Sequence, residues 1–227
     1  MVTRSTQTKG AELVLHEIGQ GEPALVFLHY WGGSARTWNS VLAMLPATVH
    51  AVAINQRGWG GSSAVDGRYD LEAAANDVVE VVAALGIERF ILVGHSMGGK
   101  VAQILAGRRT RGLVGMVLIA PAPPTPMQVP EEVRAGMLAS YQTREGALEA
   151  LKVLAGPTLS NEAREQVIED TLRGEAGAKR SWPEHGMLAD VSVARPGNDL
   201  PVEVLVGDHD QIEREVVLRP IFERYVG

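Results

Sequence analysis

The stretch ILVGHSMGGK, Ile91–Lys100, places one serine between glycines where two sequence patterns meet. The apolar, β-favouring run Phe90–Val93 stops at Gly94, and residues 97–108 follow a helical pattern. A serine on such a tight strand-to-helix turn adopts unfavourable backbone dihedrals, and small neighbours two positions away let strand and helix approach each other. The pattern predicts that Ser96 is a nucleophile presented at the end of a buried strand. A purely structural turn is the alternative, because short glycine–serine matches also arise by chance.

Strand-like and helix-like segments alternate on both sides of this turn. Continuous apolar strands joined by helices are typical of a mostly parallel sheet flanked by helices, which is an α/β fold. The helical pattern is clearest at Leu71–Ile87, where apolar residues recur at steps of three and four. The expected strands are 11–19, 24–30, 50–58, 89–94 and 113–123, and the other expected helices are 35–45 and 97–108.

The pattern changes after Pro121. PAPPTPMQVP is a proline-rich hinge, and residues 131–188 contain helix-like segments without a convincing strand. A strand pattern returns in PVEVLVGDHD, Pro201–Asp210, and an amphipathic helix containing Pro220 is expected after it. We therefore expect three parts: a first core part, a helical cap insertion and a second core part, at 1–122, 123–195 and 196–227.

The composition excludes several classes of function. The net charge is −6 and no basic stripe occurs, so we expect no nucleic-acid partner. The absence of cysteine excludes disulfides and thiolate chemistry. The N-terminus lacks an apolar signal segment, and the longest uncharged apolar stretch, 112–124, is too short to cross a bilayer. We therefore expect a cytoplasmic protein without a membrane partner.

Five stretches taken in order resemble the α/β-hydrolase superfamily, in its branch of capped esterase-like, perhydrolase-like and lactonase-like enzymes. They are VFLHYWGGSARTW, NQRGWGGS, ILVGHSMGGKVA, MVLIAPAPP and VEVLVGDHDQIE, and they cover the sheet rather than the cap. The resemblance implies an α/β-hydrolase fold with a mostly parallel central sheet and a helical cap. It also implies a serine hydrolase that cleaves a small carboxylic ester, thioester or lactone through an acyl-enzyme, without a metal or cofactor.

The same resemblance implies a role for particular residues. Ser96 would be the nucleophile, and the N–H groups of Trp31 and Met97 would form the oxyanion hole. The acid follows the last strand in a G-x-x-D pattern, which selects Asp210. Asp208 is then a loop carboxylate.

Four further residues are expected to line or shape the binding region. His29 ends a strand beside the first glycine loop and is expected to position that loop rather than act as a base. Tyr30 stands where the family has glycine, which narrows the mouth of the pocket. His95 adjoins Ser96, but neighbouring side chains diverge, so we expect no proton transfer between them. Trp182 is expected in an apolar wall of the cap, with ordinary packing as the alternative.

The expected catalytic histidine is missing, because no histidine follows Asp210. His185 in the cap is a possible substitute. Three explanations stay open: the chain is part of a longer enzyme, a second chain supplies the imidazole, or the protein binds without turnover. We favour the first. A sheet that ends at VEVLVG would also leave an edge through which two copies can pair.

A receptor-like binding protein on the same fold is therefore the second functional hypothesis. A nucleotide-binding α/β protein is a distant third, because NQRGWGGSS lacks the dinucleotide-binding glycine spacing and no P-loop lysine motif occurs.

Overall fold

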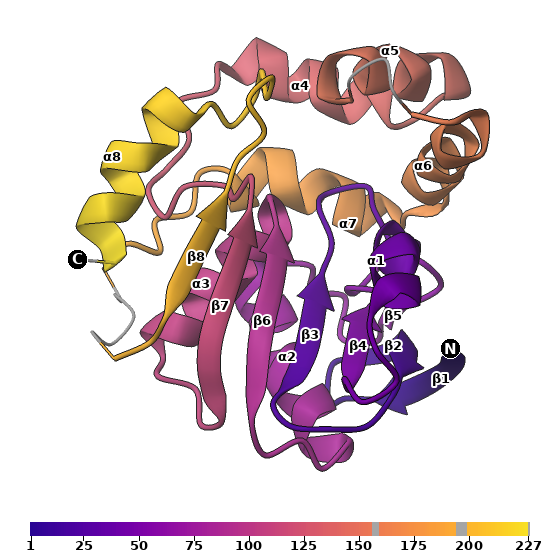
Figure 1. The fold of residues 1–227 in the computed structure, drawn as a ribbon. Coiled ribbons are helices and arrows are strands. Elements are labelled where there is room, and N and C mark those ends of the chain that lie inside the picture. Colours follow the sequence, from indigo (N-terminus) through magenta and orange to yellow (C-terminus); the bar gives the residue numbers. More distant parts are fainter. Residues whose placement is uncertain (156–158, 194–198, 227) are drawn as a thin grey trace.

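The computed structural model describes residues 1–155, 159–193 and 199–226. Within them, the sheet runs in the order β1-β2-β4-β3-β6-β7-β8, and the short β5 pairs with β2 (Figure 1). Strands β4, β3, β6, β7 and β8 are parallel neighbours, whereas β2 is antiparallel to β1, β4 and β5. The strands are β1 (Val2–Gln7), β2 (Ala11–Ile18), β3 (Ala24–Leu28), β4 (Ala51–Ile54), β5 (Ser63–Ala64), β6 (Phe90–His95), β7 (Leu113–Ile119) and β8 (Val202–Leu205).

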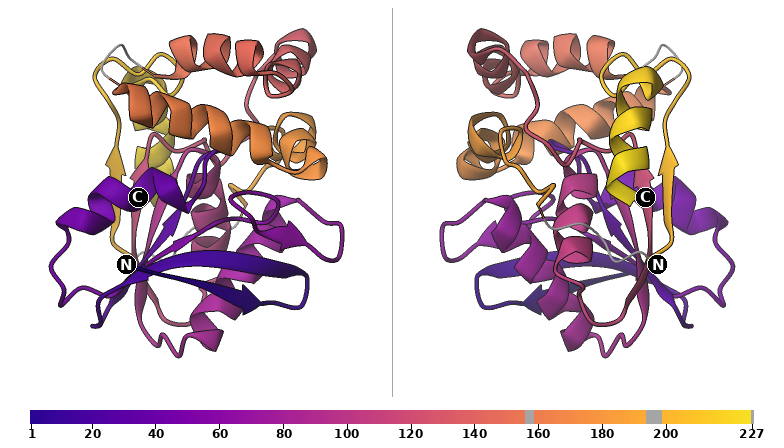
Figure 2. Two further views of the ribbon diagram at one scale, coloured as in Figure 1. Left: turned by 90° about the vertical axis from the view of Figure 1, so that its right-hand side faces the viewer. Right: turned by 90° about the vertical axis from the view of Figure 1, so that its left-hand side faces the viewer.

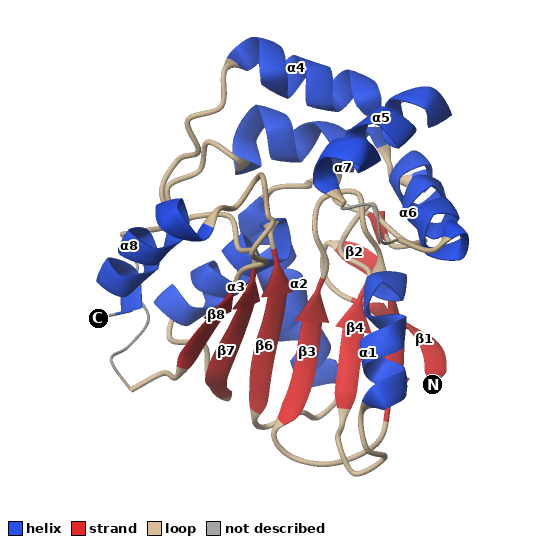
Figure 3. Ribbon diagram, turned by 45° about the horizontal axis from the view of Figure 1, so that its top comes forward, coloured by secondary structure: helices blue, strands red, loops and turns tan. Residues whose placement is uncertain are grey.

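Helices cover the sheet on both faces and along its upper edge. Helix α1 lies on one face, and α2 and α3 lie on the other (Figure 2). A group of helices formed by residues 131–186, which we call the cap, lies over the carboxyl ends of the parallel strands (Figure 3). The helices are η1 (Ala35–Trp38), α1 (Asn39–Met44), α2 (Leu71–Ala84), α3 (Met97–Gly107), α4 (Glu131–Ser140), α5 (Arg144–Leu154), α6 (Asn161–Arg173), α7 (Ala176–Ser181), η2 (Trp182–Gly186) and α8 (Glu215–Val226).

The central strands are apolar on both faces because both faces are buried. In β6, Phe90 and Leu92 join the large core beneath α2 and α3, whereas Val93 joins a smaller cluster with Phe27 and Trp38 beneath η1 and α1. This two-sided burial is the physical reason for the continuous apolar runs in the sequence. The predicted fold class, a mostly parallel α/β sheet flanked by helices with a helical insertion, is confirmed.

The sequence pattern does not predict β1, and it extends β4 too far. The β1 sequence VTRSTQ is polar and mostly exposed, so the strand forms through its antiparallel pairing with β2, from Val2 opposite Glu17 to Gln7 opposite Glu12. The strand expected at 50–58 ends at Ile54. Beyond it the backbone turns back on itself, with the Gly58 N–H donating to Ser62 O at 3.1 Å.

The cap position follows from the topology of the chain. The cap follows β7, so it starts at the carboxyl edge of the sheet, where parallel α/β folds place their ligands. Because β8 is parallel to β7, the chain returns to the opposite edge before β8 begins. All described elements of the cap are helical or connecting segments, as the sequence pattern predicts. Among the described residues, none of the helices is long and apolar enough to cross a membrane.

Candidate active site

Ser96 occupies a strained turn between β6 and α3. Its φ is 50° and its ψ is −113°, a conformation that non-glycine residues adopt only when the surrounding structure enforces it. Backbone hydrogen bonds hold it on both sides: Ser96 N–H donates to Ile119 O at 3.1 Å, and Ser96 O accepts from Ala122 N–H at 3.2 Å. Hydrogen bonds to β7 and to the segment after it therefore maintain the strained backbone of Ser96.

The two glycines that flank Ser96 are needed because the chain has no room for side chains there. A Cβ on Gly94 would lie 2.6 Å from Gly98 O, within the first turn of α3. A Cβ on Gly98 would collide with the Leu28 carbonyl oxygen and lie 2.7 Å from His29 O. The start of α3 thus packs directly against the end of β3, which brings residues 29–34, here called the first loop, beside Ser96.

The first loop directs the Trp31 amide. Tyr30 O accepts hydrogen bonds from the Gly33 N–H at 3.0 Å and from the His29 ring at 2.7 Å. In a trans peptide the C=O and the following N–H point in opposite directions, so these two bonds fix the direction of the Trp31 N–H. That N–H has no acceptor among the described residues. Met97 is the first residue of α3, where a helix leaves its N–H without an intrahelical partner.

His29 is a buried, neutral positioning group. Its Nε2 accepts from the Gln56 N–H at 3.1 Å, which leaves the proton on Nδ1 to donate to Tyr30 O. The pKa of His29 is lowered to about 4, mainly by burial and to a smaller extent by the nearby His95. The hydrogen bond to Tyr30 O opposes this shift. Both ring nitrogens of His29 are therefore hydrogen-bonded within the protein, and the residue has no exposed surface.

Tyr30 and His95 lie together beside Ser96. Their rings meet edge-on, with centroids 5.1 Å apart. Burial lowers the pKa of His95 to about 4, and the carboxylate of Asp210 opposes this shift, so Asp210 lies near the turn that carries Ser96. The ring of Tyr30 packs back against Gly33, and burial raises its pKa to about 12.

Asp210 is the better placed of the two candidate acids. One carboxylate oxygen, Oδ1, accepts from the N–H groups of Ile212 and Glu213, each at 2.8 Å. The other oxygen has no partner among the described residues and is available to an imidazole. Asp208 is exposed in the preceding turn, in keeping with its expected loop position.

Two buried ionisable residues near Asp210 were not predicted from the sequence. Glu213 is 6% exposed, and its carboxylate faces Asp210 and Lys100. Burial and, to a smaller extent, the carboxylate of Asp210 raise the pKa of Glu213 to about 7, and Lys100 opposes the shift. Lys100, one turn into α3, is fully buried and donates to Thr125 O at 3.3 Å. Burial lowers the Lys100 pKa to about 8, against the attraction of Asp190 and Glu213.

Among the described residues, no histidine ring is hydrogen-bonded to Ser96. His185, the possible substitute base, has a side chain that is 76% exposed and lies 4.0 Å from Glu184. His16 and His50 bond to Asn39 and Glu17 in the β2 region, at 3.1 and 2.8 Å. His209 is exposed beside Asp210.

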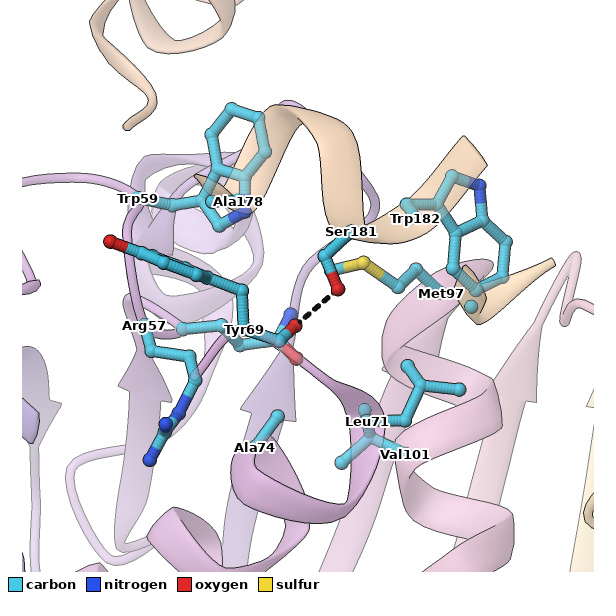
Figure 4. A pocket seen from close by; sticks show the side chains of 12 residues that line it. Arg57, Trp59, Tyr69, Leu71, Ala74, Met97, Val101, Ala178, Ser181 and Trp182 are labelled. Atoms are coloured by element: carbon cyan, nitrogen blue, oxygen red, sulfur yellow. Dashed lines mark hydrogen bonds between the residues drawn. The ribbon is translucent and has the colours of Figure 1, made fainter. Parts of the chain in front are cut away.

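Trp182 lies in the seam between the cap and the core. It lines a cavity of about 20 Å³, roughly the space of one water molecule, together with the side chain of Met97 (Figure 4). Trp59 and Tyr69 line the same cavity from the core. The hydroxyl of Ser181 donates to Tyr69 O at 2.7 Å, so this part of the cap is fastened to the core.

The described residues contain no cluster of three or more histidine, aspartate or glutamate side chains that could hold a metal ion.

Comparison with known proteins identifies the family. The model of the alpha/beta hydrolase family matches residues 25–227. The chain belongs to the alpha/beta hydrolase family. The resemblance inferred from the five sequence stretches is therefore confirmed.

Proteins named for several different activities are similar to this chain. The non-heme haloperoxidase of Rhodococcus erythropolis is 29% identical over 91% of this chain and 81% of its own length. The bifunctional esterase/perhydrolase of Acinetobacter calcoaceticus is 32% identical over 52% of this chain and 44% of its own length. Among solved structures, an esterase from Exiguobacterium antarcticum covers the whole chain at 19% identity with a TM-score of 0.82, and 88% of that esterase is matched. At this identity the structural match supports the fold alone.

The substitution Gly98→Ala tests the packing beneath Ser96. The added methyl group meets backbone oxygens that cannot move aside, so we expect Gly98→Ala to lower the free energy of unfolding by about 1–3 kcal/mol or more. Gly136→Ala, in α4, is the matched control because no atom lies within 4 Å of its Cβ position. There we expect a gain of about 0.5–1 kcal/mol, since alanine favours a helix interior. Denaturant unfolding measures both, and equal effects would contradict the packing argument.

The raised pKa of Glu213 predicts a pH-dependent effect of Glu213→Gln. The folded protein holds the proton of Glu213 more tightly than the unfolded chain does. The stabilisation that this protonated carboxyl gives the fold is therefore complete below about pH 4.5 and is lost as the pH rises through 7. The stability of Glu213→Gln relative to the parent should therefore increase between pH 5 and pH 8, by up to about 3 kcal/mol. The control Glu215→Gln changes an exposed carboxylate on the same segment. Urea unfolding at both pH values measures the difference, and a pH-independent offset for Glu213→Gln would refute the assignment.

Proposed function

We propose that this chain is a serine hydrolase that cleaves a small carboxylic ester, thioester or lactone through an acyl-enzyme on Ser96. The observation that carries the proposal is the strained backbone of Ser96 at the start of α3, next to a loop with an unpaired, directed N–H. Such a turn holds a hydroxyl where it can reach a bound carbonyl carbon. Two main-chain amides, those of Met97 and Trp31, would receive the negative charge on the carbonyl oxygen.

The proposed reaction has two steps. Ser96 Oγ loses its proton to an imidazole and bonds to the substrate carbonyl carbon, and the carbonyl electron pair moves onto the oxygen facing the two amides. Collapse of this intermediate expels the alcohol or thiol, which takes the proton from the imidazolium. Water then attacks the acyl-enzyme by the same route and releases the acid. The second oxygen of Asp210 would orient the imidazole.

The chemistry of the relatives supports an acyl group as the substrate class. The support comes from the bifunctional esterase/perhydrolase among the proteins to which the chain is similar. A buried, neutral His29 adds no charge of its own beside the proposed oxyanion site, which leaves the amide dipoles to act there.

A second candidate function is binding without turnover. It is favoured by one observation, the lack of a hydrogen bond between Ser96 and any histidine of the described residues. Without a base, a serine site retains only the part of its rate enhancement that comes from binding and the oxyanion hole, about 10³–10⁴ over water in a related protease type.

A fluorophosphonate probe distinguishes the two functions. If Ser96 is an aligned nucleophile, the probe should label the chain at Ser96, and Ser96→Ala should abolish labelling. Mass spectrometry of the labelled peptide 90–108 identifies the site. No labelling, combined with a ligand-induced rise in melting temperature, would support the binding function instead.

Added imidazole tests whether the base is the missing part of the site. If the amides and Ser96 are already in place, imidazole in the buffer should accelerate p-nitrophenyl acetate hydrolysis by the parent well above its effect on Ser96→Ala. Equal rates for parent and variant at every imidazole concentration would show that a missing base is not what limits hydrolysis at Ser96.

A further inference from the structure

The first loop is held by the cap as well as by the core. The ring of Tyr141, at the end of α4, stacks on Trp31 with centroids 3.8 Å apart and planes within 12°. Its hydroxyl donates to Trp31 O at 3.2 Å. The same ring covers Gly32, where an added Cβ would lie 2.6 Å from it and where φ is +89°. Tyr141 thus contacts the residue whose N–H is proposed to bind the oxyanion.

Helix α6 holds the next positions of the loop. The hydroxyl of Thr171 donates to Gly32 O at 3.2 Å. The carboxylate of Asp170 accepts from the Ser34 hydroxyl at 2.7 Å and from the Arg36 guanidinium at 2.6 and 3.0 Å. The bonds from Ser34 to Asp170 and from Thr171 to Gly32 form away from solvent, whereas the Arg36 side chain is 32% exposed. Buried charge-assisted hydrogen bonds of this kind are among the stronger polar contacts in proteins.

Helix α7 supplies a third attachment. The indole N–H of Trp31 donates to Lys179 O at 3.1 Å. The carbonyls of Trp31 and Gly32 and the indole of Trp31 are therefore all bonded to the cap, while Tyr30 O is bonded within the loop. If the cap moved away as a rigid lid, each of these buried groups would lose its partner, at a free-energy cost for each.

We propose that Tyr141, Asp170 and Thr171 of the cap are positioning residues for the Trp31 amide, so that cap and oxyanion site form one mechanical unit. This inference rests on the proposed function, because it assigns the Trp31 N–H to the oxyanion. It means that the cap does more than cover the carboxyl ends of the strands. A displacement of α6 or α4 would change the direction of the Trp31 N–H. A substrate that contacts those helices would therefore also affect the proposed oxyanion site.

Two conservative variants test the proposal without removing the cap. Tyr141→Phe keeps the stacked ring and removes the bond to Trp31 O, and Thr171→Val removes the bond to Gly32 O at nearly constant volume. The double variant should lower the maximum rate of fluorophosphonate labelling by about 10- to 100-fold, since small misplacements of a reacting group have effects of this size. The probe concentration at half-maximal rate should change much less.

The control is Glu165→Gln, which removes the exposed ion pair between Arg144 and Glu165 on α5 and α6 and leaves the loop contacts intact. Its labelling rate should equal that of the parent. Melting temperatures of all variants show whether each is folded. If the double variant does not fold, Thr171→Val alone is used, with a smaller reduction expected.

Hydrogen exchange of the first loop gives a readout that does not depend on activity. Amides in residues 30–36 should exchange faster in Tyr141→Phe/Thr171→Val than in the parent or Glu165→Gln. Faster exchange with unchanged labelling would overturn the positioning role, and unchanged exchange would overturn the coupling itself. If the parent is not labelled at all, the proposed function fails, and the exchange result alone decides whether cap and loop are coupled.

Discussion

The structure depends on the contact between the start of α3 and the end of β3, which only glycine at position 98 allows. This contact keeps Ser96 in a backbone conformation that costs about 1–3 kcal/mol in isolation. The parallel pairing of β3 with β6 and of β6 with β7 holds the two ends of the turn in place. Because the sheet supplies this restraint, the backbone of Ser96 is held in place without the help of a substrate.

The electrostatic arrangement around Ser96 follows from burial. His29 and His95 both have pKa values lowered to about 4, so both are neutral at pH 7. Glu213 has a pKa raised to about 7 and shares its surroundings with Asp210 and Lys100. The segment that carries the candidate acid therefore places a partly ionised, buried carboxylate near Lys100 of α3. A change in either group would alter the field that an imidazole next to Asp210 experiences.

The core of this fold is predictable from the sequence because its signals are local. Three features each predict local structure from a few neighbouring residues: the apolar run Phe90–Val93, the glycines around Ser96 and the apolar stripe along α2. β1 is not predictable in this way, since its polar residues form a strand only through pairing with β2.

The candidate site was predictable only in part, for the same reason. Ser96, Met97, Trp31 and Asp210 follow strand ends, and the topology brings strand ends together. Tyr141 and Thr171 reach the first loop from more than a hundred residues away, and no local pattern marks them. The burial of Glu213 beside Lys100 is likewise decided by how the segment after β8 packs on α3. Long-range packing of this kind appears only in the folded structure.

The central claim is that Ser96 faces two converging main-chain amides. A crystal structure of the protein after reaction with a small fluorophosphonate tests it most directly, because the phosphonyl oxygen occupies the position of the oxyanion. The account predicts that this oxygen lies about 2.7–3.1 Å from the nitrogens of both Met97 and Trp31. A phosphonyl oxygen directed into solvent, or a Trp31 N–H turned away from it, would contradict the account.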